Sequence, residues 1–247
     1  MMLLVDAGNS TIKWALYDAG CLQGGGRFGY RDQNLAALLD PAWGALPVPT
    51  RIVVASVAGD GVAAALGDWT RARWSVLPHY LQSSAMAAGV CNAYDVAQDL
   101  GVDRWAALVA AHHHYPGAVC IIDAGTAITL DLLAADGRHL GGVILPGIEM
   151  LKTVLLEDTA RVLTACPSGP AGVTASSTAG GVHGGAVVMA VAAIERIIAA
   201  HAATQPEGMT RLLTGGDAGA LLTLLAGQLQ HDPELVLKGL AILAGEA

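Results

Sequence analysis

The stretch LLVDAGNSTIK, residues 3–13, decides the fold, and VCIIDAGTAITLD, residues 119–131, repeats its pattern. Each begins as a short apolar run, continues into Asp-Ala-Gly with a small hydroxyl or amide residue, and ends in a second β-rich run. An apolar run that is bounded by Asp and Gly is typical of a buried strand entering a tight turn. Both stretches are therefore predicted to be hairpins.

Both predicted turns carry residues that suit phosphate. Gly8 and Gly125 have no Cβ, so the backbone can come close to a ligand, and successive turn N–H groups can bind phosphate oxygens. Asn, Ser or Thr side chains add hydrogen bonds, while Asp6 and Asp123 would hold a cation beside those phosphates. Two such turns in one chain predict a duplicated nucleotide-binding unit. The alternative is two unrelated turns, because Asp-X-Gly is a common sequence.

The composition fits a globular protein of two domains. The chain has 247 residues, of which 53% are hydrophobic and 14% charged, which is enough for a real core and excludes disorder. The repeated turn favours two domains, 1–117 and 118–247, with Pro116-Gly117 at the boundary. The net charge of −8 and the lack of any Lys/Arg run argue against a nucleic-acid partner.

The sequence has no pattern typical of a signal peptide, a membrane span, a zinc site or a disulfide framework. The opening MMLLVDAG has no basic region before its apolar run, which argues against a signal peptide. The apolar run Ala186–Ile194 is too short to span a bilayer. The four cysteines, at positions 21, 91, 120 and 166, form no C-x-x-C pair, so neither a zinc site nor a disulfide framework is predicted. We expect a cytoplasmic protein without a membrane partner.

The first half of the chain is predicted to alternate short strands and helices. The predicted strands are Leu3–Val5, Ile12–Tyr17, Arg27–Tyr30, Arg51–Val57 and Ser75–Leu77, and the predicted helices are Leu35–Leu39, ended by Pro41, and Gly61–Thr70. The segment Gly24–Gly29 matches G-x-G-x-x-G, but no helix and no acidic partner follow it. We interpret it as a flexible turn.

Asp103 lies at the start of an apolar segment. Gly101-Val102 breaks the chain, and Asp103 is well placed as the N-cap of a helix over Arg104–Ala111. A cap alone would account for Asp103 without any chemistry.

The second half contains a predicted functional loop and a long helix. The predicted elements are a strand at Gly141–Gly147, a helix from about Ile148 to Thr159, a loop at 164–181, a helix at Gly184–Ala203, a strand at Arg211–Leu213, a turn at Thr214–Asp217 and a helix at Ala218–Leu225. An idle loop of that length is uncommon in a compact domain. The apolar face of the long helix is wide, which favours a central or interface position.

Taken together, the two Asp-Ala-Gly turns and the late Thr-Gly-Gly turn resemble the phosphate and adenosine motifs of the sugar-kinase/actin superfamily. Gly101–Trp105, Gly141–Gly147 and Ser177–Ala179 narrow the resemblance to type III pantothenate kinase, over Leu3 to about Gly239. One departure is Ala97, where the family usually has proline. The resemblance implies an α/β fold of two duplicated actin-like (ribonuclease H-like) subdomains, each a mixed sheet flanked by helices, with an ATP cleft between them.

The resemblance also implies roles for individual residues. Asp103 would be the general base, and Asp123 would bind a monovalent cation, potassium or ammonium, while magnesium accompanies ATP. The implied ATP-binding residues are Asp6, Ala7, Gly8, Asn9, Ser10, Thr11, Ile12, Lys13 and Thr126. The implied pantothenate-binding residues are Tyr94, Gly101, Val102, Asp103, Arg104 and Thr178. The family's members are homodimers.

These roles predict ATP-dependent phosphorylation of pantothenate at its 4′-hydroxyl. One alternative is a regulatory protein that keeps the ATP fold without turnover, for example as a transcriptional accessory factor. The presence of Asp6, Asp103 and Asp123 argues against it, and so does the acidic charge. A kinase for another small hydroxyl compound rests on fold analogy alone.

Overall fold

The computed structural model of the chain describes residues 1–157, 172, 174–202 and 208–246. Its contacts divide the chain into two compact units. The first comprises Met1–His114, Gly137–His139 and Glu234–Ala247, and the second comprises Tyr115–Asp136 and Leu140–Pro233. The two domains expected at 1–117 and 118–247 stay a prediction, and the contact units differ from them in grouping the last residues of the chain with the first unit.

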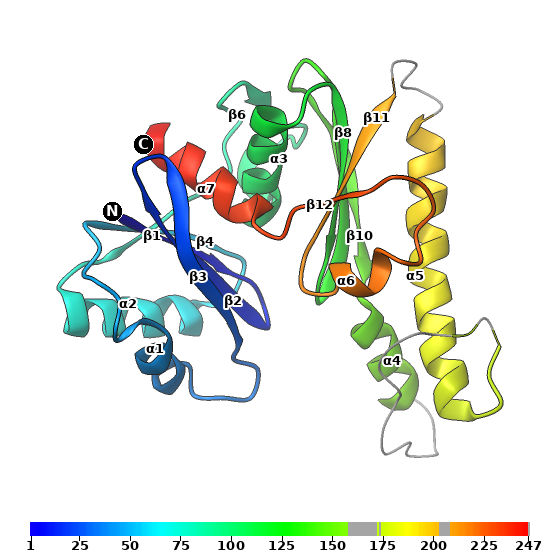
Figure 1. The fold of residues 1–247 in the computed structure, drawn as a ribbon, viewed down its shortest axis with the longest axis horizontal. Helices are drawn as coiled ribbons and strands as arrows, with labels where there is room; N and C mark the ends of the chain where they lie inside the picture. Colours follow the sequence, from blue (N-terminus) through cyan, green and yellow to red (C-terminus); the bar gives the residue numbers. More distant parts are fainter. Residues whose placement is uncertain (158–171, 173, 203–207, 247) are drawn as a thin grey trace. The chain divides into compact units, whose positions relative to one another are not determined.

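A five-stranded mixed sheet forms the centre of the first unit (Figure 1), in the order β3-β2-β1-β4-β5. Its strands are β1 (Met2–Ala7), β2 (Thr11–Asp18), β3 (Cys21–Gly29), β4 (Arg51–Ser56) and β5 (Pro78–Tyr80). The first three pair antiparallel, whereas β4 lies parallel to both β1 and β5. The carboxyl ends of β1 and β4 therefore meet at one edge, at Ala7 and Ser56.

Helices cover both faces of this first sheet. On one face α1 (Leu35–Trp43) and α2 (Asp60–Trp74) pack through Leu39, Trp43 and Leu66 against the apolar side chains of β1 and β4. On the other face lie α3 (Val102–His114) and α7 (Leu235–Glu246), which pack against each other and against the strands. The unit also holds β6 (Met86–Ala87), β7 (Val90–Cys91) and the short 3-10 helix η1 (Ala97–Asp99).

The second unit repeats the topology of the first, with its sheet in the order β10-β9-β8-β11-β12. The strands are β8 (Ala118–Ala124), β9 (Ala127–Leu133), β10 (His139–Pro146), β11 (Met209–Thr214) and β12 (Gln230–His231). Again the first hairpin, β8 with β9, is antiparallel, and β11 is parallel to β8 and to β12. The prediction of an α/β fold with two duplicated mixed sheets flanked by helices is confirmed.

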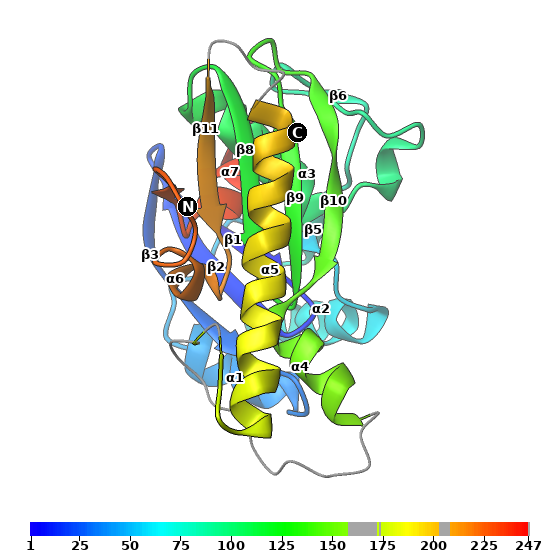
Figure 2. The ribbon, with the colours of Figure 1, turned by 90° about the vertical axis from the view of Figure 1, so that its right-hand side faces the viewer.

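Three helices accompany the second sheet, namely α4 (Ile148–Glu157), α5 (Thr178–Ala202) and α6 (Ala218–Leu221). Figure 2 shows α5 running along the sheet, and its buried stripe, which includes Ala186, Ala190 and Ile194, lies in the same core cluster as Ile122. By length and composition alone, α5 could cross a membrane. A core helix passes the same test, and this stripe gives α5 a core to pack against.

Several predicted element boundaries are wrong, each for a local reason. Gly24–Gly29 belongs to β3 instead of forming a turn, and a Cβ on Gly26 would lie 3.2 Å from the indole nitrogen of Trp14 on β2. The strand predicted at Ser75–Leu77 is displaced, because Ser75 takes a left-handed conformation that ends α2 and the strand follows at Pro78. Helix α1 continues through Pro41 to Trp43, whose ring is buried in the core.

In the second half the differences concern helix ends. Helix α5 begins at Thr178, so the last part of the predicted loop 164–181 is helical. Residues 164–171 and 173 of that loop, the end of the helix predicted to Thr159, and Ala203 lie outside the described residues. Helix α6 is shorter than predicted. Helix α7 was not predicted; its Gly239 lies against the carbonyl of Ala106 on α3.

Candidate functional site

The first Asp-Ala-Gly turn connects β1 to β2. Asp6 and Ala7 end β1, Gly8, Asn9 and Ser10 make the turn, and Thr11, Ile12 and Lys13 begin β2. The amide of Gly8 donates a hydrogen bond of 3.1 Å to the carbonyl of Thr11, which closes the turn. Ala7 and Ile12 are buried in the core, so only their backbone can reach a ligand. The other six predicted ATP-binding residues in this segment are exposed or half-buried.

Tyr30, just beyond the end of β3, holds this first turn from outside. Its hydroxyl donates a 2.6 Å hydrogen bond to the carbonyl of Gly8, and its amide donates one of 3.1 Å to the carbonyl of Ser10. Desolvation by burial raises the pKa of Tyr30, so the hydroxyl keeps its proton for this bond at neutral pH. The sequence did not single out Tyr30, because its partner lies 22 residues away.

Asp103 does not have the predicted N-cap position. Helix α3 already begins at Val102, which places Asp103 in its first turn, and the carbonyl of Gly101 accepts the first intrahelical bond, from Trp105. The Asp103 carboxylate accepts a 2.7 Å hydrogen bond from the amide of Arg104. A Cβ on Gly101 would lie 2.6 Å from Asp103 Oδ1, so glycine leaves room for this carboxylate.

Val57 connects the Asp103 segment to the first turn. Its amide donates a 3.1 Å hydrogen bond to the carbonyl of Ala7, where β1 runs into the turn. A Cβ on Gly101 would lie 3.7 Å from a methyl group of Val57, in van der Waals contact. In the first unit, the segment of the predicted general base and the first phosphate turn therefore both lie beside Val57, at the carboxyl ends of β1 and β4. Ligands of parallel sheets bind outside this edge.

Tyr94 and Arg104 form a pair beside Asp103. The guanidinium of Arg104 donates a 3.0 Å hydrogen bond to the hydroxyl of Tyr94 and lies 5.7 Å from the centre of its ring. Arg104 is only 7% exposed, which fits a guanidinium with fixed partners. Ala97 begins η1, and its carbonyl accepts a hydrogen bond from the Asn92 side chain, so the departure from proline leaves an ordered segment.

The second turn connects β8 to β9. The amide of Gly125 donates to the carbonyl of Ala127 at 3.0 Å, as Gly8 does to Thr11 in the first unit. The amide of Gly147 donates to the carbonyl of Thr126 at 3.1 Å. A Cβ on Gly147 would overlap the carbonyl oxygen of Gly125, so this turn admits glycine alone at that neighbouring position. The G-G-x-I-x-P-G segment thus supports the second turn.

Gly215, in the Thr-Gly-Gly turn, packs against the other side of the Asp123–Ala124 strand end. Its φ of +100° and the overlap of a Cβ with the carbonyl oxygen of Ala124 both require glycine. The same Cβ position lies 2.5 Å from Asp123 Oδ1, so the carboxylate lies directly over Gly215. The amide of Asp217 then donates a 2.9 Å hydrogen bond to the carbonyl of Ala124.

Asp123 and Thr214 offer oxygen ligands for a cation. They are paired in register on parallel strands, so their side chains share a face of the sheet. Thr214 is 1% exposed, and its hydroxyl has no hydrogen-bond partner within the described chain. Potassium is coordinated by oxygen atoms in proteins, so the Asp123 carboxylate and the Thr214 hydroxyl are suitable ligands for it. Where the structure describes the chain, no group of three or more His, Cys, Asp or Glu side chains gathers as a metal cage.

Thr178 is the first residue of α5, in the second unit, and its side chain is exposed. The preceding Ser177 caps the helix, because its hydroxyl accepts a 3.1 Å hydrogen bond from the amide of Gly180. Thr126 and Asp123 belong to the same unit, whereas the remaining predicted site residues belong to the first. The structure thus groups the predicted residues into two sets, one for each unit.

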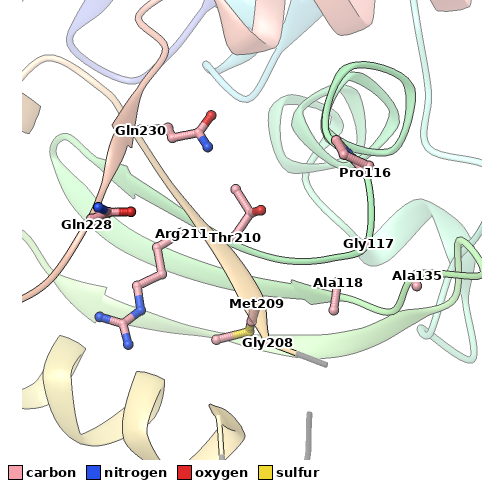
Figure 3. Close-up of a pocket in the computed structure, with 10 residues that line it drawn as sticks. All are labelled: Pro116, Gly117, Ala118, Ala135, Gly208, Met209, Thr210, Arg211, Gln228 and Gln230. Atoms are coloured by element: carbon pink, nitrogen blue, oxygen red, sulfur yellow. The ribbon is translucent and has the colours of Figure 1, made fainter. Parts of the chain in front are cut away.

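A cavity of about 500 Å³ lies at the opposite end of the second sheet from Asp123. It opens where β8 and β11 begin, and Figure 3 shows Thr210 and Arg211 on opposite sides of β11. Its lining comprises Pro116, Gly117, Ala118, Ala135, Gly208, Met209, Thr210, Arg211, Gln228 and Gln230. None of these residues belongs to the predicted site, and the amino ends of the strands are not where α/β sheets of this type bind nucleotides.

Comparisons with known sequences agree with these motifs. The model of the type III pantothenate kinase family matches residues 2–200. The type III pantothenate kinase of Halorhodospira halophila is 43% identical over 245 residues, covering 97% of this chain and 96% of the relative. That of Nitrosococcus oceani is 40% identical over 249 residues, covering 99% of this chain and 94% of the relative.

Solved structures with the same fold include two that cover nearly the whole chain. A 2-dehydro-3-deoxygalactonokinase protein from Sinorhizobium meliloti has a TM-score of 0.61 at 15% identity, covering 100% of this chain and 96% of its own. A protein described as a Baf family transcriptional activator from Campylobacter jejuni has a TM-score of 0.60 at 20% identity, covering 99% and 98%. At these identities the likeness shows the fold alone. From the family match and the sequence relatives, the chain belongs to the type III pantothenate kinase family, with an actin-like ATPase fold.

Proposed function

We propose that this protein transfers the γ-phosphoryl group of ATP to the 4′-hydroxyl of pantothenate, giving 4′-phosphopantothenate and ADP, in the first step of coenzyme A biosynthesis. One observation carries the detailed proposal: Val57 donates a hydrogen bond to Ala7 in the first phosphate turn and lies beside Gly101 of the Asp103 segment, where an added Cβ would be 3.7 Å from its methyl group. Because both lie beside Val57, the base can contact the pantothenate hydroxyl while the turn binds the phosphates of ATP. Phosphoryl transfer depends mainly on such positioning.

The two turns would bind the ATP phosphates. In the first turn the backbone amides, together with the side chains of Asn9, Ser10 and Lys13, supply hydrogen bonds and a positive charge. Thr126 adds a hydroxyl from the second turn. Asp6 provides one carboxylate for magnesium, which proteins commonly bind through one or two carboxylates and the substrate phosphates. Magnesium would neutralise charge on the β- and γ-phosphates.

Asp103 would act as the general base. Its carboxylate takes the proton from the 4′-hydroxyl as that oxygen bonds to the γ-phosphorus, and the bond from phosphorus to the ADP oxygen breaks. Arg104 would bind the pantothenate carboxylate through its guanidinium. Gly101, Val102, Tyr94 and Thr178 would complete the substrate site.

Asp123 would hold the monovalent cation, potassium or ammonium, with the Thr214 hydroxyl as a second oxygen. Support comes from the shared face of the two side chains and from the buried Thr214 hydroxyl. The cation would add positive charge near the second phosphate turn. Its role in the reaction would be electrostatic only.

A homodimer and a cytoplasmic location complete the proposal. The second unit exposes apolar side chains on β10, α4 and α5, namely Val143, Ile144, Met150, Val154, Leu155, Val188 and Met189. Exposed apolar surface of this kind marks an interaction site, and a second copy of the chain is the proposed occupant. Light scattering should give twice the chain mass for the wild type and the single mass for Ile144→Glu/Met189→Glu. A wild-type monomer at micromolar concentration would exclude the dimer.

Measurement of ADP release from purified protein tests the activity. With ATP, magnesium and pantothenate, we expect turnover in potassium or ammonium chloride and little in sodium chloride at the same ionic strength. Release that does not depend on pantothenate would point to another substrate. A folded protein that binds ATP without any turnover would favour a regulatory protein.

A further inference from the structure

His139, the first residue of β10, contacts Tyr94 of the Tyr94–Arg104 pair. Its ring is stacked on that of Tyr94, with 6.1 Å between ring centres and 10° between planes. Offset aromatic stacking at this distance is favourable. His139 is only 4% exposed, so the imidazole is a fixed part of the first unit, to which Gly137–His139 belong by their contacts.

The segment Gly137–His139 also fixes the backbone before Tyr94. The carbonyl of Gly137 accepts a 2.9 Å hydrogen bond from the amide of Cys91, and Cys91 also forms a β-bridge with Arg138. The Nδ1 of His139 accepts a 3.4 Å hydrogen bond from the amide of Ala93. This segment therefore contacts three positions from Cys91 to Tyr94, so the Tyr94 ring has little freedom to move.

Tyr94 in turn orients Arg104. Its hydroxyl accepts the 3.0 Å hydrogen bond from the guanidinium, which also lies against the tyrosine ring. An arginine side chain has many rotamers, and binding a carboxylate requires that one be selected beforehand. The stack of His139 on Tyr94 thus also restricts the guanidinium that is bonded to the tyrosine hydroxyl.

We propose that His139 is a positioning residue for the carboxylate end of the pantothenate site, acting through Tyr94 on Arg104. This inference rests on the proposed function, in which Arg104 binds the substrate carboxylate. It predicts an effect on substrate affinity that depends on the substrate's negative charge, with little effect on the chemical step at Asp103.

The test compares three variants, His139→Leu, His139→Phe and the surface control His79→Ala. Leucine fills the space without a flat ring, whereas phenylalanine keeps a flat ring for the stack and loses the ring nitrogens, including the Nδ1 acceptor. For His139→Leu we expect the KM for pantothenate to rise about fivefold to tenfold, with kcat and the KM for ATP within about twofold of wild type. His139→Phe should recover most of this loss, and His79→Ala should match wild type.

A neutral substrate analogue separates positioning from a general loss of structure. The analogue carries a primary amide in place of the pantothenate carboxylate. On this analogue the KM of His139→Leu should differ from that of wild type by less than about twofold, because the contact with Arg104 is weaker in every variant. An equal loss on both substrates, or a wild-type KM for pantothenate in His139→Leu, would overturn the inference while leaving the proposed function intact. If wild type neither binds nor phosphorylates pantothenate, the proposed function fails and the inference fails with it.

Discussion

The two phosphate turns have the same topology, but they are supported in different ways. Each follows the first strand of an antiparallel hairpin and lies beside a parallel strand. The first turn is held by hydrogen bonds from Tyr30 to Gly8 and Ser10. The second is enclosed by glycine backbone, with Gly147 against Gly125 and Gly215 against Ala124.

This difference sets how each turn should respond to mutation. A hydrogen bond between a tyrosine and a carbonyl contributes a modest free energy, so its removal should weaken the first turn without dismantling it. Two backbone segments in contact leave no volume for a methyl group, so the second turn should tolerate no side chain at either glycine. Duplicated topology therefore does not imply equal tolerance to substitution.

The largest effect is expected for Gly215→Ala. The added methyl group overlaps the Ala124 backbone, and alanine is strained at a φ of +100°. The free energy of unfolding should fall by about 3 kcal/mol or more, as measured by chemical denaturation. The control is Gly219→Ala in α6, where a Cβ meets nothing within 4 Å. A loss below about 0.5 kcal/mol in Gly215→Ala would contradict the described packing.

Thr214→Val should impair cation use while sparing stability. Valine has the shape of threonine without the hydroxyl, which has no hydrogen-bond partner among the described residues. Unfolding free energy should therefore hold or rise, while the potassium concentration for half-maximal turnover rises about tenfold, the effect of losing about 1.4 kcal/mol. Thr70→Val is the opposite control, because the Thr70 hydroxyl donates to Gly67: stability should fall and potassium dependence should not change. Unaltered potassium dependence in Thr214→Val would remove Thr214 from the cation site.

Tyr30→Phe should raise the KM for ATP about fivefold, since a lost hydrogen bond costs about 1 kcal/mol. The matched control is Tyr80→Phe, which also removes a tyrosine hydroxyl bonded to a carbonyl, that of Ala63. Both variants should lose similar stability, but only Tyr30→Phe should lose ATP affinity. Equal KM values for ATP in the two variants would show that Tyr30 does not shape the first turn.

The smallest effect is expected for Ser56→Ala, at the strand end beside the first turn. The Ser56 hydroxyl, like that of Thr214, is buried without a partner in the described chain, but Ser56 is paired in register with Ala7 and not with a carboxylate. The free energy of unfolding should stay within about 0.5 kcal/mol of wild type, and the KM for ATP should stay within about twofold. A larger change in potassium dependence here than in Thr214→Val would place the cation in the first unit.

The sequence was sufficient for the two hairpins, because each is a local pattern of apolar residues and turn residues. The fold class followed from the resemblance of the motifs to a known family. It also indicated Gly147 and Gly215 within recognisable motifs, although not the backbone contacts that require them. Asp103 was predicted as the N-cap, but the helix begins two residues earlier than predicted, at Val102, and Gly101 supplies the carbonyl of the cap position.

Residues that act across long sequence separations were not predicted. Tyr30 meets Gly8, and His139 meets Tyr94, only after distant strands have folded together. The glycine run in β3 was interpreted as a turn because no helix and no acidic partner follow its G-x-G-x-x-G match. Its close approach to Trp14 depends on the pairing of β2 with β3. Local patterns cannot encode such partners.

Turnover by Asp103→Asn tests the central claim most directly. Asparagine keeps the size of the side chain and can still accept the hydrogen bond from the Arg104 amide, but it cannot take the substrate proton. We expect ATP to bind with wild-type affinity while kcat falls by about 10²–10⁴, the usual contribution of a general base. A kcat within about threefold of wild type, well short of that contribution, would contradict the assignment of Asp103 as the base.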